Sequence, residues 1–462
     1  MWIATDPGFA MMKLSLADAL SSARETRELR LGAGVLGETA RVFENQFAGH
    51  RAIIVADPHT IHVAGVTVAS ALAEAGITCL EPFIFDDSGL YSETRYVEQL
   101  VAALRGHDAI PIAIGSGTIN DLVKLAAHRT GRPGYLCVAT AASMDGYTAF
   151  GASISDRGAK QTFNCPAPRA VIADTAIICG APSWMTASGY ADLSAKITAG
   201  ADWIFADALG VEAIDPRAWN IVQGGLRDSL ADPAGARAGH ESAITPLVEG
   251  LMLAGFAMQW SKTSRPASGA EHQFSHLWDM EHHVHHGEPP SHGFKVGVAT
   301  LAITRLYEQV LAHDFAALDI DRCLAQWPAA DSLEPVIRQK FADTNFVDTA
   351  VTETHAKHSS SADLRAQLQR LKDGWPTLRA RLQAQLLPSA EMKRRLALVG
   401  APTEPEQIGI SRARLRASFC RAYHIRRRFT VLDVAMRTGT LESSLNGLFG
   451  PKAVWNFPAP AP

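Results

Sequence analysis

Residues 108–131, with the sequence DAIPIAIGSGTINDLVKLAAHRTG, decide the fold of the N-terminal part of the chain. The apolar run in this stretch predicts a buried strand, the glycines after it predict a tight turn, and the remainder has helical spacing. Apolar runs at 51–60 and 134–143 are also typical of buried strands, and helical patterns separate them. Strands that alternate with helices predict a parallel sheet covered by helices.

The pattern changes between residues 175 and 185, where one more apolar strand is followed by helical spacing and few strand patterns remain. We therefore expect an α/β domain over residues 1–180 and an all-α domain over residues 181–462. Long amphipathic segments, typical of helices, occupy 190–210, 217–229, 240–262, 293–313, 333–342, 361–385, 389–398 and 411–447.

The composition is typical of a globular protein, since 47% of the 462 residues are hydrophobic and 19% are charged. A formal net charge of −4 argues against nucleic acid or an anionic membrane as the main partner. The six cysteines are widely scattered, which predicts reduced thiols rather than a disulfide framework. The sequence contains no signal-peptide pattern and no apolar run of about 18 residues, so we expect a cytoplasmic protein without membrane spans.

The turn within residues 108–131 has the chemistry of a phosphate-binding loop. Glycine lets the backbone approach a phosphate, and the start of the following helix offers N–H donors and the positive end of a dipole. The turn matches neither G-x-G-x-x-G nor the Walker A pattern, so a plain strand-to-helix turn is the alternative. The candidate phosphate-binding residues are Gly115, Ser116, Gly117 and Thr118.

Two other strands end in residues that suit a ligand, because open α/β sheets bind ligands at the carboxyl ends of their strands. Asp57 can accept hydrogen bonds from an adenosine ribose, although capping the turn before Pro58 is the alternative. The segment that starts at Thr140 combines small residues and hydroxyls, with Ser143 and Asp145 as further candidates, and an ordinary turn is the alternative.

A second stretch, KTSRPASGAEHQFSHLWDMEHHVHHGEPPSH at 262–292, is rich in imidazoles and carboxylates. His272 and His276 lie four residues apart, which places them on one face of a helix. His292 opens a further helical pattern, and Glu271 and Asp279 lie among the histidines. Such a density of nitrogen and oxygen donors suits a divalent metal. For the motif HHVHH at 282–286, the alternative is a solvated loop.

Asp192, in the sequence SGYADLSAK, opens the helical half. One oxygen from Asp192 with one nitrogen each from His272 and His292 would leave a coordination position open for a substrate hydroxyl. Spacing along the chain does not bring these residues together, and a solvated helix acid is the commoner role for such an aspartate.

Five segments carry a family resemblance: IGSGTINDLVKLAA, VATAASMDGYTAFGASI, VIADTAIICGAPSWMTASGYADLSAKITAGADW, SRPASGAEHQFSH and HGFKVGVATL. In the same order along the chain, they resemble segments of the sn-glycerol-1-phosphate dehydrogenases. These enzymes belong to the superfamily of iron-containing alcohol dehydrogenases, glycerol dehydrogenases and dehydroquinate synthases. The match covers about residues 30–445, and SRPASGAEH and TAASMDG are its most specific parts.

The resemblance implies a dinucleotide-binding α/β domain, a helical domain, and an active site in the cleft between them. It implies that Asp192, His272 and His292 bind one divalent metal, commonly zinc or nickel, and the ligand set also suits iron(II). It implies that Asp145 lines the substrate site, with Asp121 and Lys124 nearby. Cofactor contacts are implied for Asp57, Gly115, Gly117, Thr118, Thr140 and Ser143, and Asp121 is counted with them as a candidate cofactor-binding residue.

The chain departs from the family pattern at two positions. Met144 replaces what is often a histidine before the substrate-site aspartate. The family often has His-Gly-Glu where this chain has His292-Gly293-Phe294, and an HGE occurs earlier, at His286-Gly287-Glu288. His286 is thus an alternative ligand, but we prefer His292 because FKVGVATL continues it in the family register.

The implied activity is the reversible reduction of dihydroxyacetone phosphate to sn-glycerol 1-phosphate with NAD(H) or NADP(H). The resemblance also implies a role in phospholipid metabolism and a homodimer. Asp145, Lys124 and His276 are the candidate catalytic residues, and either His276 or a bound water would relay the proton. The alternatives are a dehydrogenase of another small alcohol, a lyase of the dehydroquinate-synthase type, and a binding or structural protein that kept the fold and lost catalysis. The intact set of Asp192, His272 and His292 argues against the last of these. The candidate cations for the substrate phosphate are Lys262, Arg265 and Lys295.

Overall fold

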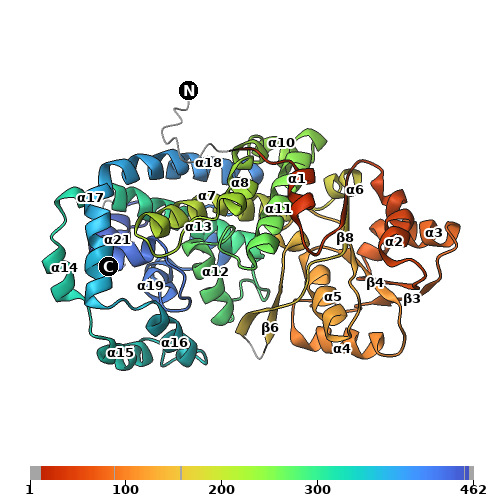
Figure 1. The fold of residues 1–462 in the computed structure, drawn as a ribbon, viewed down its shortest axis with the longest axis horizontal. Coiled ribbons are helices and arrows are strands. Elements are labelled where there is room, and N and C mark those ends of the chain that lie inside the picture. Colours follow the sequence, from red (N-terminus) through yellow and green to blue (C-terminus); the bar gives the residue numbers. More distant parts are fainter. Residues whose placement is uncertain (1–11, 88, 157–158, 452, 457–462) are drawn as a thin grey trace, which may run out of the picture. The chain divides into compact units, whose positions relative to one another are not determined.

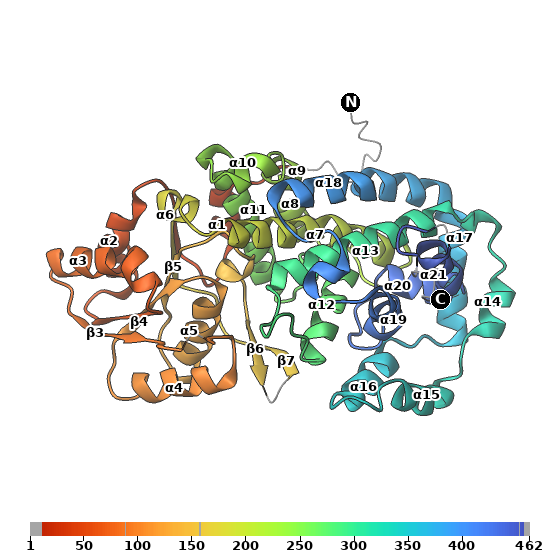
Figure 2. The same cartoon turned by 180° about the vertical axis from the view of Figure 1, so that it is seen from behind.

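The computed structural model describes residues 12–87, 89–156, 159–451 and 453–456, and these form two compact units. Helix α7 (Ser183–Ala208) contributes residues to both units. Figures 1 and 2 show the ribbon from opposite sides. The first unit contains the residues up to Leu193, Pro216–Ser264 and Leu398–Gly400, and the second contains Ser194–Asp215, Arg265–Ala397 and the residues from Ala401 onward.

A parallel sheet forms the core of the first unit, with six described strands in the order β1-β8-β5-β4-β2-β3. Residues 108–131 fold as predicted, into strand β4 followed by helix α5 (Gly117–Arg129). The predicted α/β fold with a parallel sheet is therefore confirmed. The strands are β1 (Glu28–Gly32), β2 (Ala52–Ala56), β3 (Cys79–Ile84), β4 (Ile110–Gly115), β5 (Leu136–Ala139) and β8 (Ala170–Asp174).

Burial on both faces explains the continuous apolar sequences of the central strands, because helices cover each side of the sheet. Strands β2, β4, β5 and β8 are buried along their full lengths. Alternate side chains, such as Ile54 and Ile112, pack in one cluster with Phe43 of α2 (Thr39–Phe47) and with residues of α3 (Val66–Glu74). Full burial of one such side chain contributes about 1.5–3 kcal/mol to the free energy of folding.

The strand order reverses at β2, because the chain adds β3 on one side of β2 and then returns to add β4 on the other. Right-handed crossovers place α3 on one face of the sheet, and α4 (Thr94–Leu104) and α5 on the other. Figure 1 shows α4 and α5 together, away from α2 and α3. In open α/β sheets such a reversal marks where ligands bind, here at the carboxyl ends of β2 and β4.

An antiparallel hairpin, β6 (Ala152–Asp156) and β7 (Ala159–Phe163), follows β5 and is not expected from the sequence. Its two short strands carry polar residues in place of the apolar runs that mark the strands of the sheet. Helix α5 holds the hairpin, because Asp121 accepts a hydrogen bond from the Ser153 N–H at 3.1 Å.

Helix α11 (Glu241–Ser261) belongs to the first unit although it lies well beyond residue 180. The buried Gln259 side chain accepts the Glu25 N–H and donates to the Thr148 carbonyl, both at 3.0 Å. The compact units thus differ from the expected division at residue 180, because helical spacing predicts a helix without indicating which core it joins. The neighbouring helices of this unit are α8 (Pro216–Gln223), α9 (Leu226–Ser229) and α10 (Pro233–Arg237).

The described elements of the second unit are helices, which confirms the predicted helical fold of the C-terminal part. From residue 270 onward they are α12 (Ala270–Met280), α13 (His292–Ala312), α14 (Ile320–Gln326), α15 (Leu333–Lys340), α16 (Val347–Lys357), α17 (Ser361–Gln385), α18 (Ser389–Val399), α19 (Arg412–Ala422), α20 (Val431–Arg437) and α21 (Leu441–Phe449).

Residues 411–447 form three of these helices rather than one amphipathic segment. The first break ends at Thr430, which forms a reciprocal capping box with Asp433 at the start of α20. The second break contains Gly439, whose φ of +68° is a conformation that favours glycine at the end of a helix.

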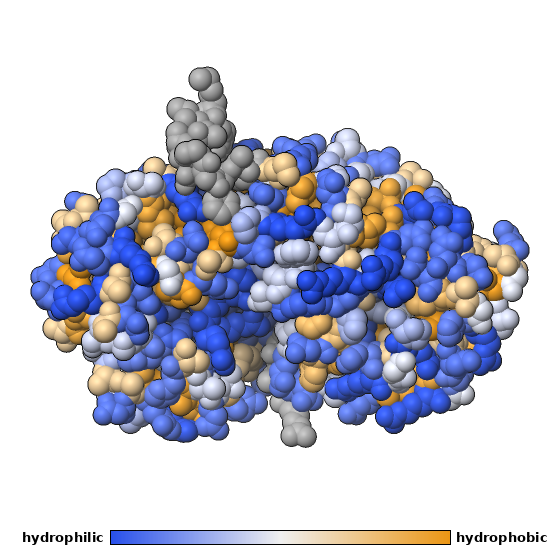
Figure 3. Space-filling view, viewed as in Figure 1, coloured by the Kyte–Doolittle hydropathy of each residue, from blue (hydrophilic) through white to orange (hydrophobic). Residues whose placement is uncertain are grey.

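Exposed large hydrophobic side chains occur at separate positions, such as Val66, Trp184 and Val336 on three different helices. Single residues of this kind are normal on a protein surface. On the face drawn in Figure 3, hydrophilic residues predominate and hydrophobic ones form small groups. Among the described helices, none has both the length and the apolar character that a membrane span requires.

Helix α7 passes close to the segment that follows β5. A Cβ atom built on Gly189 would lie only 2.0 Å from the carbonyl oxygen of Ala142. Beside it, the Ser188 hydroxyl donates to the Ser143 carbonyl at 3.3 Å. Glycine at position 189 is therefore needed for this approach, which brings α7 to the carboxyl end of β5.

We predict that Gly189→Ala destabilises the protein by about 1–3 kcal/mol, because the added methyl group overlaps a backbone carbonyl that cannot move aside. Gly374→Ala is the matched control, since Gly374 lies inside α17 and a Cβ there meets nothing within 4 Å. The control variant should be more stable than the unaltered protein by about 0.5–1 kcal/mol, because alanine has a higher helix propensity than glycine. Urea unfolding measures both changes, and equal stabilities of the two variants would contradict this account of the packing.

Candidate metal and cofactor site

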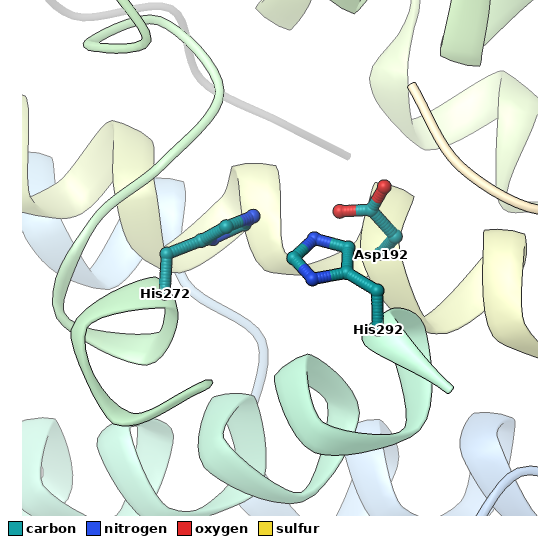
Figure 4. A group of neighbouring side chains, drawn as sticks. All are labelled: Asp192, His272 and His292. Carbon is teal, nitrogen blue, oxygen red and sulfur yellow. The ribbon is translucent and has the colours of Figure 1, made fainter. Parts of the chain in front are cut away.

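Three side chains from three helices converge at one point (Figure 4). Asp192 lies on α7, His272 lies on α12, and His292 is the first residue of α13. One potential ligand atom from each residue lies within 4.8 Å of the other two. Asp192 and His272 are buried, and His292 is half-buried. The structure thus brings together the three residues that were expected to act together, although they are far apart in sequence.

A buried carboxylate fixes the ring of His272. Glu271 and His272 both lie in the first turn of α12, which begins after Gly269. The His272 Nδ1 atom lies 2.8 Å from Glu271 Oε1, and this oxygen also accepts the Gly269 N–H at 2.6 Å. The Thr198 hydroxyl lies 2.9 Å from the other oxygen of Glu271. With Nδ1 engaged, Nε2 is the nitrogen of His272 that can bind a metal.

A second buried acid, Asp202, lies beside Glu271. Its oxygens accept the Tyr307 hydroxyl at 2.6 Å and the Ala270 N–H at 2.7 Å. Burial and the negative charge of Glu271 raise the pKa of Asp202. Burial also acts to raise the pKa of Glu271, but its hydrogen bonds, first of all the one with His272, outweigh burial and lower that pKa below its ordinary value. The surroundings of Glu271 thus favour its ionised form more than those of Asp202 do.

The fully buried side chain of Asp192 is held by the segment after β5. Its Oδ2 atom accepts a hydrogen bond from the Asp145 N–H at 3.1 Å. Asp145, expected to line the substrate site, therefore adjoins the cluster through its backbone. Its contact with a substrate stays a prediction.

His276 lies one turn after His272 on α12 and is half-buried. The His276 ring centroid lies 6.3 Å from that of His272 and 6.5 Å from that of His292, while those two lie 5.4 Å apart. At the start of α13, the Ser291 hydroxyl accepts the Phe294 N–H at 3.3 Å, which caps the helix and fixes where His292 lies. His276 is thus outside the group of three but next to it.

The donor set fits a divalent transition metal. Zinc, nickel and iron(II) all accept two imidazole nitrogens and one carboxylate oxygen, and three protein ligands leave a position open. The side chains point toward one another in Figure 4. A cation there would also compensate the buried charges of Asp192 and Glu271. The assignment of the three residues as metal ligands is a proposal that this geometry and donor chemistry support.

The predicted phosphate-binding turn lies at the carboxyl end of β4, beside the reversal of strand order. Ser116 has an extended backbone, and α5 begins at Gly117. A Cβ on Gly117 would lie 2.8 Å from the Met144 Cε atom, so glycine lets this turn pack against the segment after β5. Gly115, Ser116, Gly117 and Thr118 thus stand at a helix start that can receive a phosphate. Their binding of a dinucleotide stays a prediction.

Asp57 follows β2, on the other side of the reversal. Its Oδ1 atom accepts the His59 N–H and the Thr60 N–H, both at 2.8 Å. The alternative role of Asp57 as a turn-capping residue is therefore present in the structure. A ribose contact would fall to its second oxygen and stays a prediction.

Thr140 and Ser143 are buried in the segment after β5. The Thr140 N–H donates to the Gly115 carbonyl at 3.2 Å, which joins the turns after β4 and β5. The Ser143 hydroxyl lies 3.5 Å from the Tyr147 hydroxyl. Both residues therefore help to shape this segment, and their contact with a cofactor is untested.

Lys124 and Asp121 have structural partners instead of facing the cluster. The buried Lys124 ammonium donates to the carbonyls of Gly146 and Gly151 at 3.1 and 3.0 Å and lies 3.3 Å from Asp121 Oδ1. Three partners use the three hydrogens of an ammonium group. We therefore replace the expected catalytic role of Lys124, and the cofactor role of Asp121, with the proposal that they position the segment after β5 and the hairpin.

The three cations considered for a substrate phosphate each have a carboxylate partner. A phosphate would compete with a carboxylate for each of these cations, so the structure does not favour a phosphate site built on them. Asp279, one of the acids in the histidine-rich stretch, forms an ion pair with Lys295 and is not part of the cluster. The pairs are Lys262 with Glu25, Arg265 with Glu212 and Lys295 with Asp279.

The histidines at 282–286 do not join the cluster. Both ring nitrogens of His283 have partners, the Ile408 carbonyl at 2.6 Å and the Arg414 guanidinium at 2.8 Å. His286 has a φ of +54°, and its ring centroid lies 3.9 Å from that of His285. His292, not His286, therefore lies with Asp192 and His272.

Comparisons with known proteins decide the family. The sequence model described as iron-containing alcohol dehydrogenase matches residues 30–182. The NAD(P)+ glycerol-1-phosphate dehydrogenase of Geobacillus stearothermophilus is 32% identical over 389 residues, which cover 83% of this chain and 85% of that one. This chain belongs to the glycerol-1-phosphate dehydrogenase family.

Family relatives extend to archaea, and solved structures share the fold. The enzyme of the same name from Pyrococcus furiosus is 33% identical over 61% of this chain and 78% of its own length. A probable glycerol dehydrogenase from Sinorhizobium meliloti has a TM-score of 0.58 at 17% identity and covers 91% of this chain and 96% of that one. The glycerol dehydrogenase from Schizosaccharomyces pombe also has a TM-score of 0.58, at 15% identity, and covers 95% of this chain and 93% of that one.

The sequence does not reveal the roles of two residues at the candidate site. Glu271 is visible only as one carboxylate among histidines, and its contact with His272 depends on how α12 begins. Its place directly before His272 in SRPASGAEH is the one available signal. Gly189 is one of 36 glycines, and only the path of α7 shows why it is needed.

We predict that His292→Ala weakens Zn²⁺ binding by more than the roughly 10–100-fold loss typical of outer-shell partners, because a direct ligand is removed. His286→Ala is the matched control and should keep the affinity of the unaltered protein, since His286 lies outside the cluster. Competition with a chromogenic chelator measures both dissociation constants. Loss of Zn²⁺ binding in the His286 variant alone would contradict the assignment of His292.

Proposed function

We propose that this protein reduces dihydroxyacetone phosphate to sn-glycerol 1-phosphate with NADH or NADPH, and that it also catalyses the reverse reaction. The cluster of Asp192, His272 and His292 carries the proposal, because it places metal donors together in a chain of the glycerol-1-phosphate dehydrogenase family. Reduction of the ketone consumes one hydride from the nicotinamide and one proton, and it yields the secondary alcohol and NAD(P)+.

The chemistry divides between the bound groups and the chain. A divalent metal at the cluster would supply a Lewis acid for the carbonyl oxygen of the substrate, and the nicotinamide would supply the hydride. Asp192, His272 and His292 would hold the metal. The chain contributes positioning, since the Asp145 N–H holds Asp192 and the Ser291 cap fixes the start of the helix that carries His292.

The dinucleotide would bind at the carboxyl ends of β2 and β4. The turn from Gly115 to Thr118 would receive the pyrophosphate at the start of α5. The second oxygen of Asp57 would accept the ribose hydroxyls, which favours NAD without barring NADP. The two sites lie on either side of the strand-order reversal, where a dinucleotide crosses in other open α/β sheets.

The proposal includes zinc or nickel as the metal, with iron(II) as the third option, because a set of two imidazoles and one carboxylate suits all three. It also includes a homodimer, as the family resemblance implies, and a reducing cytoplasmic environment. All six cysteines are free thiols within the described residues, which is compatible with such an environment.

We expect purified protein to oxidise NADH or NADPH with dihydroxyacetone phosphate, to lose this activity on chelation, and to regain it with Zn²⁺ or Ni²⁺. Dihydroxyacetone is the matched substrate control and should react far more slowly, because it lacks the phosphate. Chiral analysis should identify sn-glycerol 1-phosphate. Equal rates with both substrates would favour a polyol dehydrogenase, and turnover without net change in NAD(P)H would favour a lyase.

We propose that His276 relays the proton, because it adjoins the cluster from the same helix as His272. His276→Asn should lower kcat by about 10²–10⁴-fold with little change in KM, as expected when a general acid is lost. His282→Asn is the control, since His282 is exposed and lies just after α12. Steady-state kinetics with unchanged metal content tests this, and a kcat within twofold of the unaltered protein would contradict the relay.

A further inference from the structure

The contacts of Glu271 give it a role that neither the ligand set nor the family assignment supplies. We propose that Glu271 is a positioning residue for the metal site: it holds His272 with its proton on Nδ1 and directs the Nε2 lone pair to the metal. This inference rests on the metal site proposed above. It adds a carboxylate that binds no metal itself yet sets how tightly the metal is held.

The hydrogen bonds around Glu271 fix the direction of its bond to His272. Glu271 Oε1 accepts the Gly269 N–H at 2.6 Å, so this oxygen is an acceptor. The same oxygen lies 2.8 Å from His272 Nδ1. A carboxyl oxygen that already accepts an N–H at this distance acts as an acceptor toward the ring as well, so Nδ1 is the donor. In the neutral ring Nε2 is then unprotonated, which is the form that binds a metal.

The start of α12 is built to hold this carboxylate in one place. A Cβ on Gly269 would lie 2.4 Å from Asp202 Oδ2 and 2.9 Å from Glu271 Oε2, so glycine is required between the two acids. Glu271 has no exposed surface, and Thr198 lies against its second oxygen. A side chain confined in this way also confines the imidazole to which it is bonded.

The two buried acids at this helix start have separate tasks. Asp202 accepts the N–H groups of Ala270 and Val431 and the Tyr307 hydroxyl, so it fixes backbone and a neighbouring helix. Glu271 contacts the backbone of Gly269 and the ring of His272. Glu271 is thus the acid that connects the helix start to a metal ligand, and Asp202 provides a control from the same location.

Removing the charge of Glu271 should weaken the metal site without removing a ligand. The carboxylate raises the electron density of the imidazole and attracts the cation directly, and loss of such outer-shell partners typically costs about 10–100-fold in metal affinity. Glu271→Gln keeps the size of the side chain and removes the charge. Asp202→Asn removes an acid of the same helix start that is bonded to backbone and to Tyr307.

Metal affinity is the direct test, measured with Zn²⁺ by chelator competition on folded, metal-free protein. We expect the Zn²⁺ dissociation constant to rise about 10–100-fold in Glu271→Gln and to stay within threefold in Asp202→Asn. Removal of the Asp202 carboxylate should instead lower the melting temperature of the protein. Metal addition should also raise the melting temperature of the unaltered protein more than that of Glu271→Gln. His272→Ala is the reference for a lost ligand.

The outcomes separate this inference from the proposed metal site. If the unaltered protein binds no stoichiometric Zn²⁺, or binds it equally with His272→Ala, the metal site itself is wrong. If His272→Ala abolishes binding but folded Glu271→Gln keeps the original affinity within threefold, the role of Glu271 alone is overturned. Imidazole ¹⁵N shifts of metal-free unaltered protein give a test that needs no folded variant at position 271: a proton on Nε2 of His272 would also overturn it.

Discussion

The buried carboxylate of Asp192 is the constraint on which the candidate site depends. A carboxylate without exposure is unfavourable unless hydrogen bonds or a cation compensate it. The Asp145 N–H provides one such bond, and it requires α7 to run against the segment after β5. That approach in turn requires glycine at position 189, where any side chain would meet the Ala142 carbonyl. The hydrogen bond that compensates Asp192 thus accompanies a close approach of α7 that glycine at position 189 permits.

Helix starts provide the other two members of the cluster. His272 lies in the first turn of α12, after Gly269, and His292 lies directly after the Ser291 cap of α13. Capping interactions fix where a helix begins, and a residue in the first turn is therefore placed more firmly than one on a loop. The same N-terminal N–H groups stabilise the buried acids Glu271 and Asp202.

Most of the fold could be predicted from the sequence, because strands buried on both faces leave continuous apolar runs and the helices leave amphipathic ones. The hairpin of β6 and β7 could not, since its strands carry polar residues and its support comes from Asp121. Nor could the membership of α11 in the first unit, which depends on hydrogen bonds of Gln259 to residues distant in sequence.

The site shows a similar division. Asp192, His272 and His292 could be grouped through a family resemblance but not through their spacing, because three separate helices carry them. Lys124 has the chemistry of a catalytic residue, yet its hydrogen bonds to Gly146 and Gly151 give it a structural role. A sequence shows which side chains have reactive groups, whereas the fold decides which of those groups are already occupied by hydrogen-bond partners.

A crystal structure of the metal-loaded protein, with diffraction recorded on both sides of the metal absorption edge, tests the central claim most directly. Our account predicts one strong anomalous peak within about 2.0–2.2 Å of an Asp192 oxygen and a nitrogen each of His272 and His292. A peak at the histidines of 282–286 instead, or none near Asp192, would contradict it.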